Sequence, residues 1–239
     1  MNSAEVTPRV QRYCAYCGAV TDALTRDHVV PKALWGGQGS LPKAVVTVPA
    51  CPSCQRYWDA EAKYFRNMVV AMIDRGKHPV SDHLLEGPVR RSLERSRRTR
   101  RDFFRNVRWV EQRNRSGLIL GYRLAFEIDV SRFSRSIEKI VRGLFSCKSL
   151  YALPSGYRVV VIRGNDFWAD SGFQNLLAVM EPTAGCGDDV FVMRCARDCS
   201  DPNVTAWVLQ FYGAIAVFAW TEVDVPLAQP ATLATINSG

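Results

Sequence analysis

The chain has 239 residues, of which 47% are hydrophobic and 23% are charged, and its formal net charge is +8. This composition is ordinary for a folded globular protein and excludes a wholly disordered chain. No apolar run approaches the ~18 residues that a membrane-spanning helix needs. The first nine residues lack the basic and apolar regions of a signal peptide. We therefore expect a cytoplasmic protein without a membrane partner. Its excess positive charge favours nucleic acid, although it also suits a merely basic soluble protein.

Four of the eight cysteines stand in two Cys-x-x-Cys pairs, Cys14/Cys17 and Cys51/Cys54. Two thiolates separated by two residues fit adjacent corners of a tetrahedron, and Gly18 allows a tight turn behind the first pair. In a cytosolic chain such pairs favour metal binding over disulfides. The pairs therefore predict one structural zinc ion, and the alternative is four reduced structural cysteines.

The interval between the pairs contains the segment 25–32, Thr-Arg-Asp-His-Val-Val-Pro-Lys, and the second pair is followed by an apolar helical period that continues to Ile73. This arrangement resembles the HNH endonuclease family. In that family a Cys-x-x-Cys pair precedes an Asp-His-x-x-Pro strand, and a second pair opens a helix. The resemblance covers residues 13–65, about a quarter of the chain. Segment 46–51 and the helix positions Glu61, Tyr64 and Phe65 are similar to a stand-alone bacterial subgroup.

The resemblance implies a ββα-metal nuclease module that hydrolyses DNA phosphodiester bonds. His28 would be the general base that activates water, because a histidine titrates near working pH. Asp27 would bind one catalytic divalent ion, and its hard oxygen ligand favours Mg²⁺ or Mn²⁺. Gln55, directly after the last cysteine, would complete that metal site, and Lys32 would contact a phosphate.

Two positions depart from the family pattern. Gln55 replaces the usual Asn or His, and Val46 (or Thr47 in a shifted register) stands where an Asn usually organises the loop. Asp59, one turn further along the helix, or Glu61 is an alternative metal ligand, unless both lie on a solvated helix face. These departures keep two other functions open. One is a catalytically weak zinc protein that only binds nucleic acid, and the other is an interaction protein that uses the zinc fold as a scaffold.

The expected fold is α+β in three parts. Residues 12–73 form the zinc-containing HNH module, residues 74–104 a basic helical connector, and residues 105–239 a small mixed α+β domain. Segment 81–113 contains ten arginines and five acidic residues, a net charge of +5. Pro88 is expected to open a helix in this segment. The arginines expected to contact DNA phosphates are Arg90, Arg91, Arg97, Arg98, Arg100 and Arg101. The alternative is a solvated linker helix.

In the C-terminal part, patterning predicts four strands and one helix. The strands are residues 121–130, 157–162, 204–211 and 214–222, the last two joined at Gly213, and the helix is residues 136–145. His78 and His83 are expected at the surface. Buried free thiols are expected for Cys147, Cys186, Cys195 and Cys199, with a second metal site as the alternative. Target recognition or contact with a second copy or an operon-encoded protein is the expectation for this part.

Overall fold

The structure is a computed structural model that describes residues 13–36, 45–105, 107–114, 116–162, 171–182 and 189–224. Within these residues it is a mixed α+β fold with three antiparallel sheets, two of two strands and one of five. The expectation of an α+β fold is confirmed at this level. Within the described ranges, no helix has both the length and the apolar character needed to cross a membrane.

The N-terminal unit is a two-stranded sheet followed by a long helix. Strand β1 (Thr25–His28) pairs antiparallel with β2 (Thr47–Ala50), and α1 (Pro52–Ala71) follows directly. Cys51 is the N-cap residue of α1, and Pro52 occupies its first turn, where a proline loses no helical hydrogen bond. The order of the elements is therefore strand, strand, helix, the ββα order that the family resemblance implied. A short 3₁₀ helix, η1 (Lys32–Trp35), follows β1 in the chain.

The basic segment forms a run of short helices, α2 (Pro79–Leu84), η2 (Leu85–Val89), α3 (Arg90–Arg95) and α4 (Arg97–Phe103). The expected start at Pro88 is wrong, because Pro88 lies inside η2 and the run begins at Pro79. The His78 ring caps α2 by accepting a hydrogen bond from Val80 N, and it contacts the Tyr212 ring. His78 is therefore buried and not a surface residue, whereas His83 is exposed as expected.

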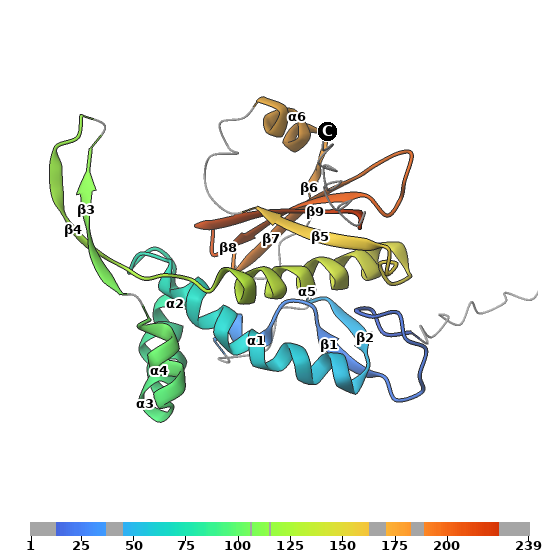
Figure 1. Cartoon of the computed structure of the whole chain (residues 1–239), viewed down its shortest axis with the longest axis horizontal. Coiled ribbons are helices and arrows are strands. Elements are labelled where there is room, and N and C mark those ends of the chain that lie inside the picture. Colours follow the sequence, from blue (N-terminus) through green and yellow to red (C-terminus); the bar gives the residue numbers. More distant parts are fainter. Residues whose placement is uncertain are drawn as a thin grey trace, which may run out of the picture.

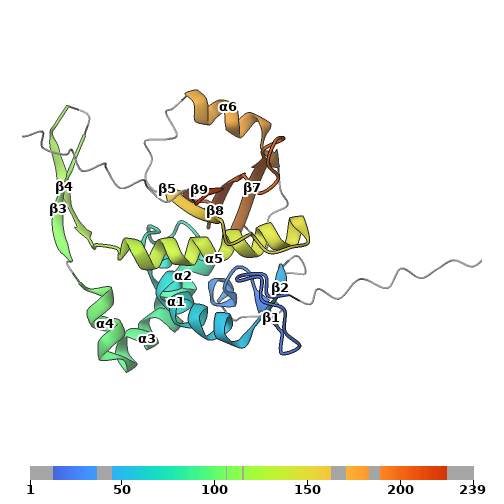
Figure 2. The same ribbon diagram turned by 45° about the vertical axis from the view of Figure 1, so that its right-hand side comes forward.

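A two-stranded ribbon follows, formed by β3 (Arg108–Arg113) and β4 (Ile119–Ala125), and Figures 1 and 2 show it projecting from the body of the molecule. Strand β4 starts and ends earlier than the predicted strand, because Val130 already begins the next helix. Residues 108–125, of which residue 115 lies outside the described ranges, are called the ribbon arm below.

Helix α5 (Val130–Ser149) is twice the length that the apolar pattern predicted, and Asp129 caps its start. It lies between the ββα unit and the five-stranded sheet (Figure 1), so it is buried on more than one face. The strand order of that sheet is β5-β9-β8-β7-β6. The bounds are β5 Tyr157–Ile162, β6 Glu181–Pro182, β7 Phe191–Arg197, β8 Thr205–Phe211 and β9 Ile215–Val223. The predicted strand 157–162 and the predicted hairpin around Gly213 are confirmed.

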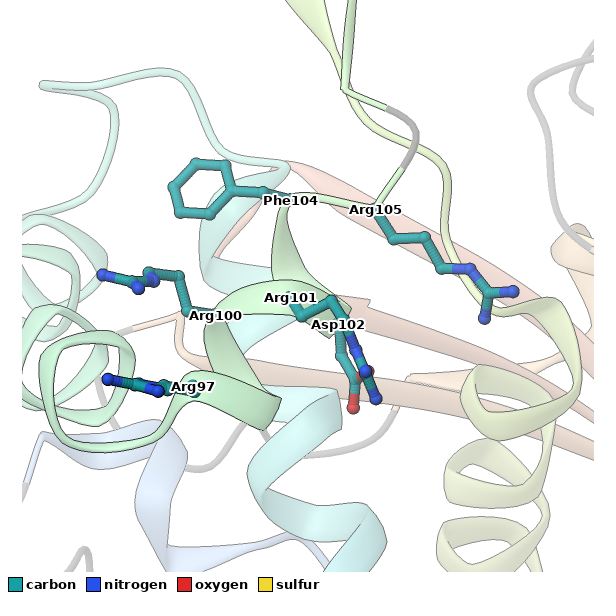
Figure 3. Close-up of a pocket in the computed structure, with 6 residues that line it drawn as sticks. All are labelled: Arg97, Arg100, Arg101, Asp102, Phe104 and Arg105. Carbon is teal, nitrogen blue, oxygen red and sulfur yellow. The ribbon is translucent and has the colours of Figure 1, made fainter.

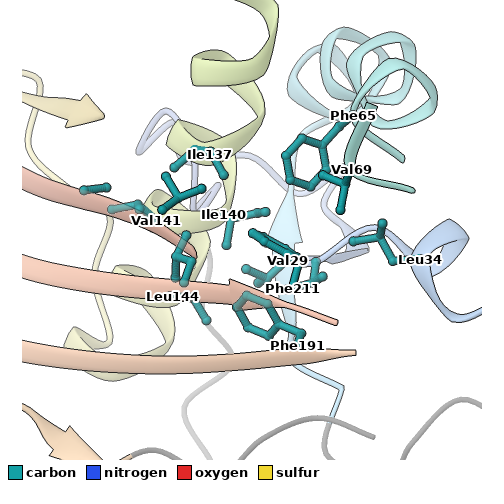
Figure 4. Packing of buried hydrophobic residues seen from close by; sticks show 14 of the residues in the cluster. Val29, Leu34, Phe65, Val69, Ile137, Ile140, Val141, Leu144, Phe191 and Phe211 are labelled. Atoms are coloured by element: carbon teal, nitrogen blue, oxygen red, sulfur yellow. The ribbon is translucent and has the colours of Figure 1, made fainter. Parts of the chain in front are cut away.

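The far face of this sheet carries α6 (Ser171–Val179) through a small cluster around Phe173 and Val208. The main core is continuous from the ββα unit through α5 to the near face of the five-stranded sheet (Figure 4). Phe65 of α1 contacts Phe133 of α5 and Phe211 of β8, with ring centroids 5.2 and 5.3 Å apart. The boundaries of the three predicted parts remain predictions, but each part contributes apolar residues to this main core.

Of the four cysteines outside the pairs, Cys195 is buried as expected. Cys147 and Cys199 are exposed, which corrects the expectation for both, and Cys186 lies outside the described residues. The corrected positions follow from the ends of elements: Cys147 is in the last turn of α5, and Cys199 lies just after β7.

Candidate cysteine metal centre and the Asp27–His28 site

The four cysteines of the two pairs meet at one end of the ββα unit. Their sulfur atoms all lie within 4.8 Å of one another, and Cys17 Sγ is 3.9 Å from Cys51 Sγ. With Zn–S bonds of about 2.3 Å, the sulfurs of a tetrahedral site are about 3.8 Å apart. The cluster therefore fits one metal ion such as zinc. In the part of the chain that the structure describes, it is the one group of His, Cys, Asp and Glu side chains close enough to hold a metal.

Backbone hydrogen bonds shape the first cysteine pair into a tight turn. Gly18 N donates to Cys14 O at 2.8 Å, and Gly18 has a φ of 74°, a conformation that glycine adopts without strain. Ala15 N donates to Pro49 O at 2.8 Å, which attaches this turn to the end of β2. Because β2 leads directly into Cys51, the two pairs are held face to face.

The electrostatics of the cluster favour a bound cation. The Ser53 hydroxyl, 3.1 Å from Cys51 Sγ, lowers the pKa of the Cys51 thiol to about 6. Burial, together with the neighbouring sulfurs, raises the pKa of the Cys54 thiol well above its ordinary range. Four thiolates so close together repel one another, and a dication removes that repulsion by binding the deprotonated forms.

Asp27 is buried, and two side chains hold its carboxylate. Asp27 Oδ2 accepts a hydrogen bond from the Tyr16 hydroxyl at 2.5 Å and lies 2.8 Å from Lys139 Nζ. Only 8% of Asp27 is exposed. Burial first, and the Asp27 charge second, raise the pKa of Tyr16, so that Tyr16 stays a hydrogen-bond donor. This pairing of β1 with α5 is absent from the sequence-based expectations.

The sequence contains one pattern that could have identified Lys139 as a buried residue. The buried residues of α5 include a stripe with spacings of three and four residues, Ser136, Lys139, Gly143 and Ser146. Residues at these spacings lie on one face of a helix, and small residues there allow another element to approach closely. A lysine on such a face is therefore covered by that element, whereas a lysine on a solvated face has no such neighbours.

His28 ends β1, is half-buried, and lies opposite Thr47 in the strand pair. Burial lowers the pKa of its imidazole, and the positive charges of Lys32 and Lys139 add to the effect, while Asp27 opposes it. His28 is therefore neutral at neutral pH, which is the form a general base requires. Lys32 is exposed in η1, four residues further along the chain.

The other predicted ligands lie around α1 with partners of their own. Gln55 Oε1 accepts a hydrogen bond from Thr25 Oγ1 at 2.8 Å, and Asp59 is exposed. The Glu61 carboxylate is held by Arg132 at 2.8 Å and Arg135 at 3.4 Å, both on α5. Glu61 therefore joins α1 to α5, and its alternative role as a metal ligand stays a prediction.

Val46 takes part in the strand pair through its backbone. Its carbonyl accepts a hydrogen bond from Val29 N at 3.1 Å. The loop is thus joined to β1 without the side-chain amide that the family pattern places at this position.

As the side chains lie, Asp27 and Gln55 do not fit a catalytic divalent ion. The ammonium of Lys139 already occupies the space beside Asp27 Oδ2. A dication about 4 Å from that ammonium would be repelled by ~8 kcal/mol at an effective dielectric constant of about 20. Gln55 offers its amide oxygen to Thr25 instead.

The predicted DNA-contacting arginines are all exposed on α3 and α4. Arg90 pairs with Glu94 one turn away at 2.9 Å. At the end of α4 several arginines line a surface hollow next to the ribbon arm, and Figure 3 shows its lining residues, Arg97, Arg100, Arg101, Asp102, Phe104 and Arg105. The side chains of this hollow suit an anionic partner, because a single carboxylate stands among four guanidinium groups.

In comparisons with known proteins, the sequence matches no family model, and neither a curated protein nor a solved structure matches the chain.

Proposed function

We propose that this chain is a DNA endonuclease of the HNH kind, with a structural zinc ion at the four cysteines and His28 as its general base. The observation that carries the proposal is the ββα unit, which has the cysteine cluster at one end and a half-buried His28 at the end of β1. The adjacent Lys32 would contact the phosphate beside the scissile bond. The lowered pKa of His28 supports the role of a base.

In the proposed reaction His28 removes a proton from a water molecule while the water oxygen attacks phosphorus. The bond between phosphorus and the 3′ oxygen breaks, and that oxygen takes a proton from solvent. The family resemblance adds Mg²⁺ or Mn²⁺ at Asp27 and Gln55, with Asp59 as an alternative ligand. The contacts of Asp27 and Gln55 do not fit such an ion, so no step of the proposal passes through it.

DNA would lie along α3, α4 and the ribbon arm. Segment 105–125 contains five arginines and one glutamate, and Trp109 and Tyr122 of the arm are 69% and 64% exposed. Two-stranded ribbons of this size enter the grooves of DNA, and exposed aromatic rings can contact sugars and bases. Each arginine that neutralises a phosphate releases counterions, so binding would weaken steeply with salt.

A second candidate is a protein that binds nucleic acid without cutting it. It is favoured by the buried pair of Asp27 and Lys139, together with Val46. The zinc unit would then hold the arginine helices in place and do no chemistry.

The test is cleavage of supercoiled plasmid by the wild type and by His28→Ala, with exposed His83→Ala as the matched control. Loss of a general base costs ~10²–10⁴-fold in rate. We expect that loss in His28→Ala alone, with zinc content and DNA binding unchanged. Because the base is the neutral imidazole and its pKa is lowered, wild-type cleavage should rise with pH, with a midpoint below the ordinary histidine value of about 6.5.

Retention of DNA without cleavage under any condition would favour the second candidate. Neither retention nor cleavage would favour an interaction protein built on the zinc unit. Cleavage at full rate by His28→Ala would contradict the assignment of the base.

A further inference from the structure

The ammonium of Lys139 lies among three electron-rich groups. It is 2.8 Å from Asp27 Oδ2, 3.2 Å from the His28 carbonyl oxygen and 5.6 Å from the centroid of the Tyr16 ring. A carboxylate, a carbonyl and an aromatic face are all favourable neighbours of a cation. Its side chain is only 6% exposed. Lys139 therefore occupies a site built for one positive charge.

Helix packing fixes the ammonium in this position. One turn after Lys139, Gly143 meets Val29, two residues after Asp27, and a Cβ atom at Gly143 would lie 2.8 Å from Val29 Cγ2. No residue larger than glycine fits there without a shift. The contact of Lys139 with Asp27 and that of Gly143 with Val29 thus follow one another along α5 and the end of β1. Together they determine how deeply the Lys139 side chain is buried.

We infer that Lys139 is the built-in cation of the Asp27 site, and that it takes the place of a divalent ion there. The ammonium neutralises Asp27 and also holds the backbone carbonyl of His28. Lys139 is thus a positioning residue that acts through β1 on the proposed base. The chemical role of the inference rests on the proposed function, but the absence of a divalent ion at Asp27 can be measured without any cleavage.

The measurement is Mn²⁺ binding to the zinc-loaded full chain, followed by electron paramagnetic resonance and by broadening of the His28 ring signals in NMR spectra. The variants are Lys139→Gln, the double variant Lys139→Gln/Asp27→Asn, and Lys63→Gln as an exposed lysine control on α1. We expect no Mn²⁺ at Asp27 in the wild type or in Lys63→Gln. Lys139→Gln should gain one bound Mn²⁺, and the double variant should lose it again.

Broadening of the His28 signals in the wild type would overturn the inference, and this arm needs no variant to fold. A folded Lys139→Gln that gains no Mn²⁺ would also overturn it, because the ammonium would then not be what excludes the ion. Lys139→Arg keeps the charge and should exclude Mn²⁺ as the wild type does.

Cleavage separates the inference from the proposed function. If the wild type cuts plasmid only with added Mg²⁺ or Mn²⁺, the inference fails and the nuclease proposal stands. If Mn²⁺ binds only to Lys139→Gln and no protein cuts DNA, the inference stands and the nuclease proposal fails.

Discussion

The neighbourhood of Asp27 and the ribbon arm both carry positive charge, but the charge is buried and paired in the first and lies on an exposed ribbon in the second. Lys139 is buried, and its ammonium contacts a carboxylate and a carbonyl. The ribbon arm has Trp109 and Tyr122 exposed and stands on two strands only. A two-stranded ribbon is marginally stable alone in water. The comparison teaches that the charge of Lys139 stabilises the fold, whereas the charges of the ribbon arm remain available to a partner.

The largest expected effect is the loss of the metal centre. Cys51→Ser should unfold the ββα unit, because the free energy of structural zinc binding, ~10–16 kcal/mol in small zinc modules, is free energy of folding. Since the core is continuous into the five-stranded sheet, we expect the whole thermal transition to move and not only its N-terminal part. Zinc content and circular dichroism check this, with exposed Cys199→Ser as the control. Folded wild-type protein without zinc would contradict it.

The next effect breaks the buried pair. Lys139→Met leaves Asp27 buried without its cation, and such a loss costs about 3–5 kcal/mol of the free energy of unfolding. The double variant Lys139→Met/Asp27→Asn removes both charges and should recover most of that loss. Urea unfolding of the wild type, Lys139→Met, Asp27→Asn and the double variant measures the coupling between the two positions. Equal stabilities for the single and double variants would mean that the pair does not hold α5 on β1.

A smaller effect tests the close contact beside that pair. In Gly143→Ala the new methyl would meet the stiff side chain of Val29. Overpacking costs about 1–3 kcal/mol, and a better helix propensity returns up to ~1 kcal/mol, so the net result should be a loss. Gly156→Ala is the matched control, because a Cβ there meets nothing within 4 Å. A Gly143→Ala protein as stable as that control would contradict the predicted contact.

The smallest effect on stability is expected in the exposed regions. Replacing Arg97, Arg98, Arg100 and Arg101 by Ala, or Trp109 and Tyr122 by Ala, should change the free energy of unfolding by no more than about 0.5 kcal/mol. DNA affinity should nevertheless fall, and the arginine variant should flatten the salt dependence by ~0.9 in slope for each lost phosphate contact. Arg158→Ala, on the distant strand β5, is the charge control. Unchanged binding would leave these helices and the arm as connectors.

Local pattern was sufficient for several elements. The spacing of the two cysteine pairs predicted a cluster, Gly213 placed the β8–β9 hairpin, and the β-branched run at residues 157–162 predicted β5. Each of these depends on residues that are neighbours in the chain. The family resemblance placed His28 on a strand between the two cysteine pairs, and in the structure it is the last residue of β1.

What pairs with Asp27 could not be read from its neighbours. Lys139 is 112 residues away, and it reaches Asp27 because Gly143 and the core around Phe65 bring α5 against β1. The same packing places Arg132 beside Glu61, which the sequence suggested as an alternative metal ligand. The sequence alone determined which residues can ligate, donate or carry charge. Tertiary packing determined which of them meet, because the contacts of a buried charge are set by the helix that covers it and not by the order of the chain.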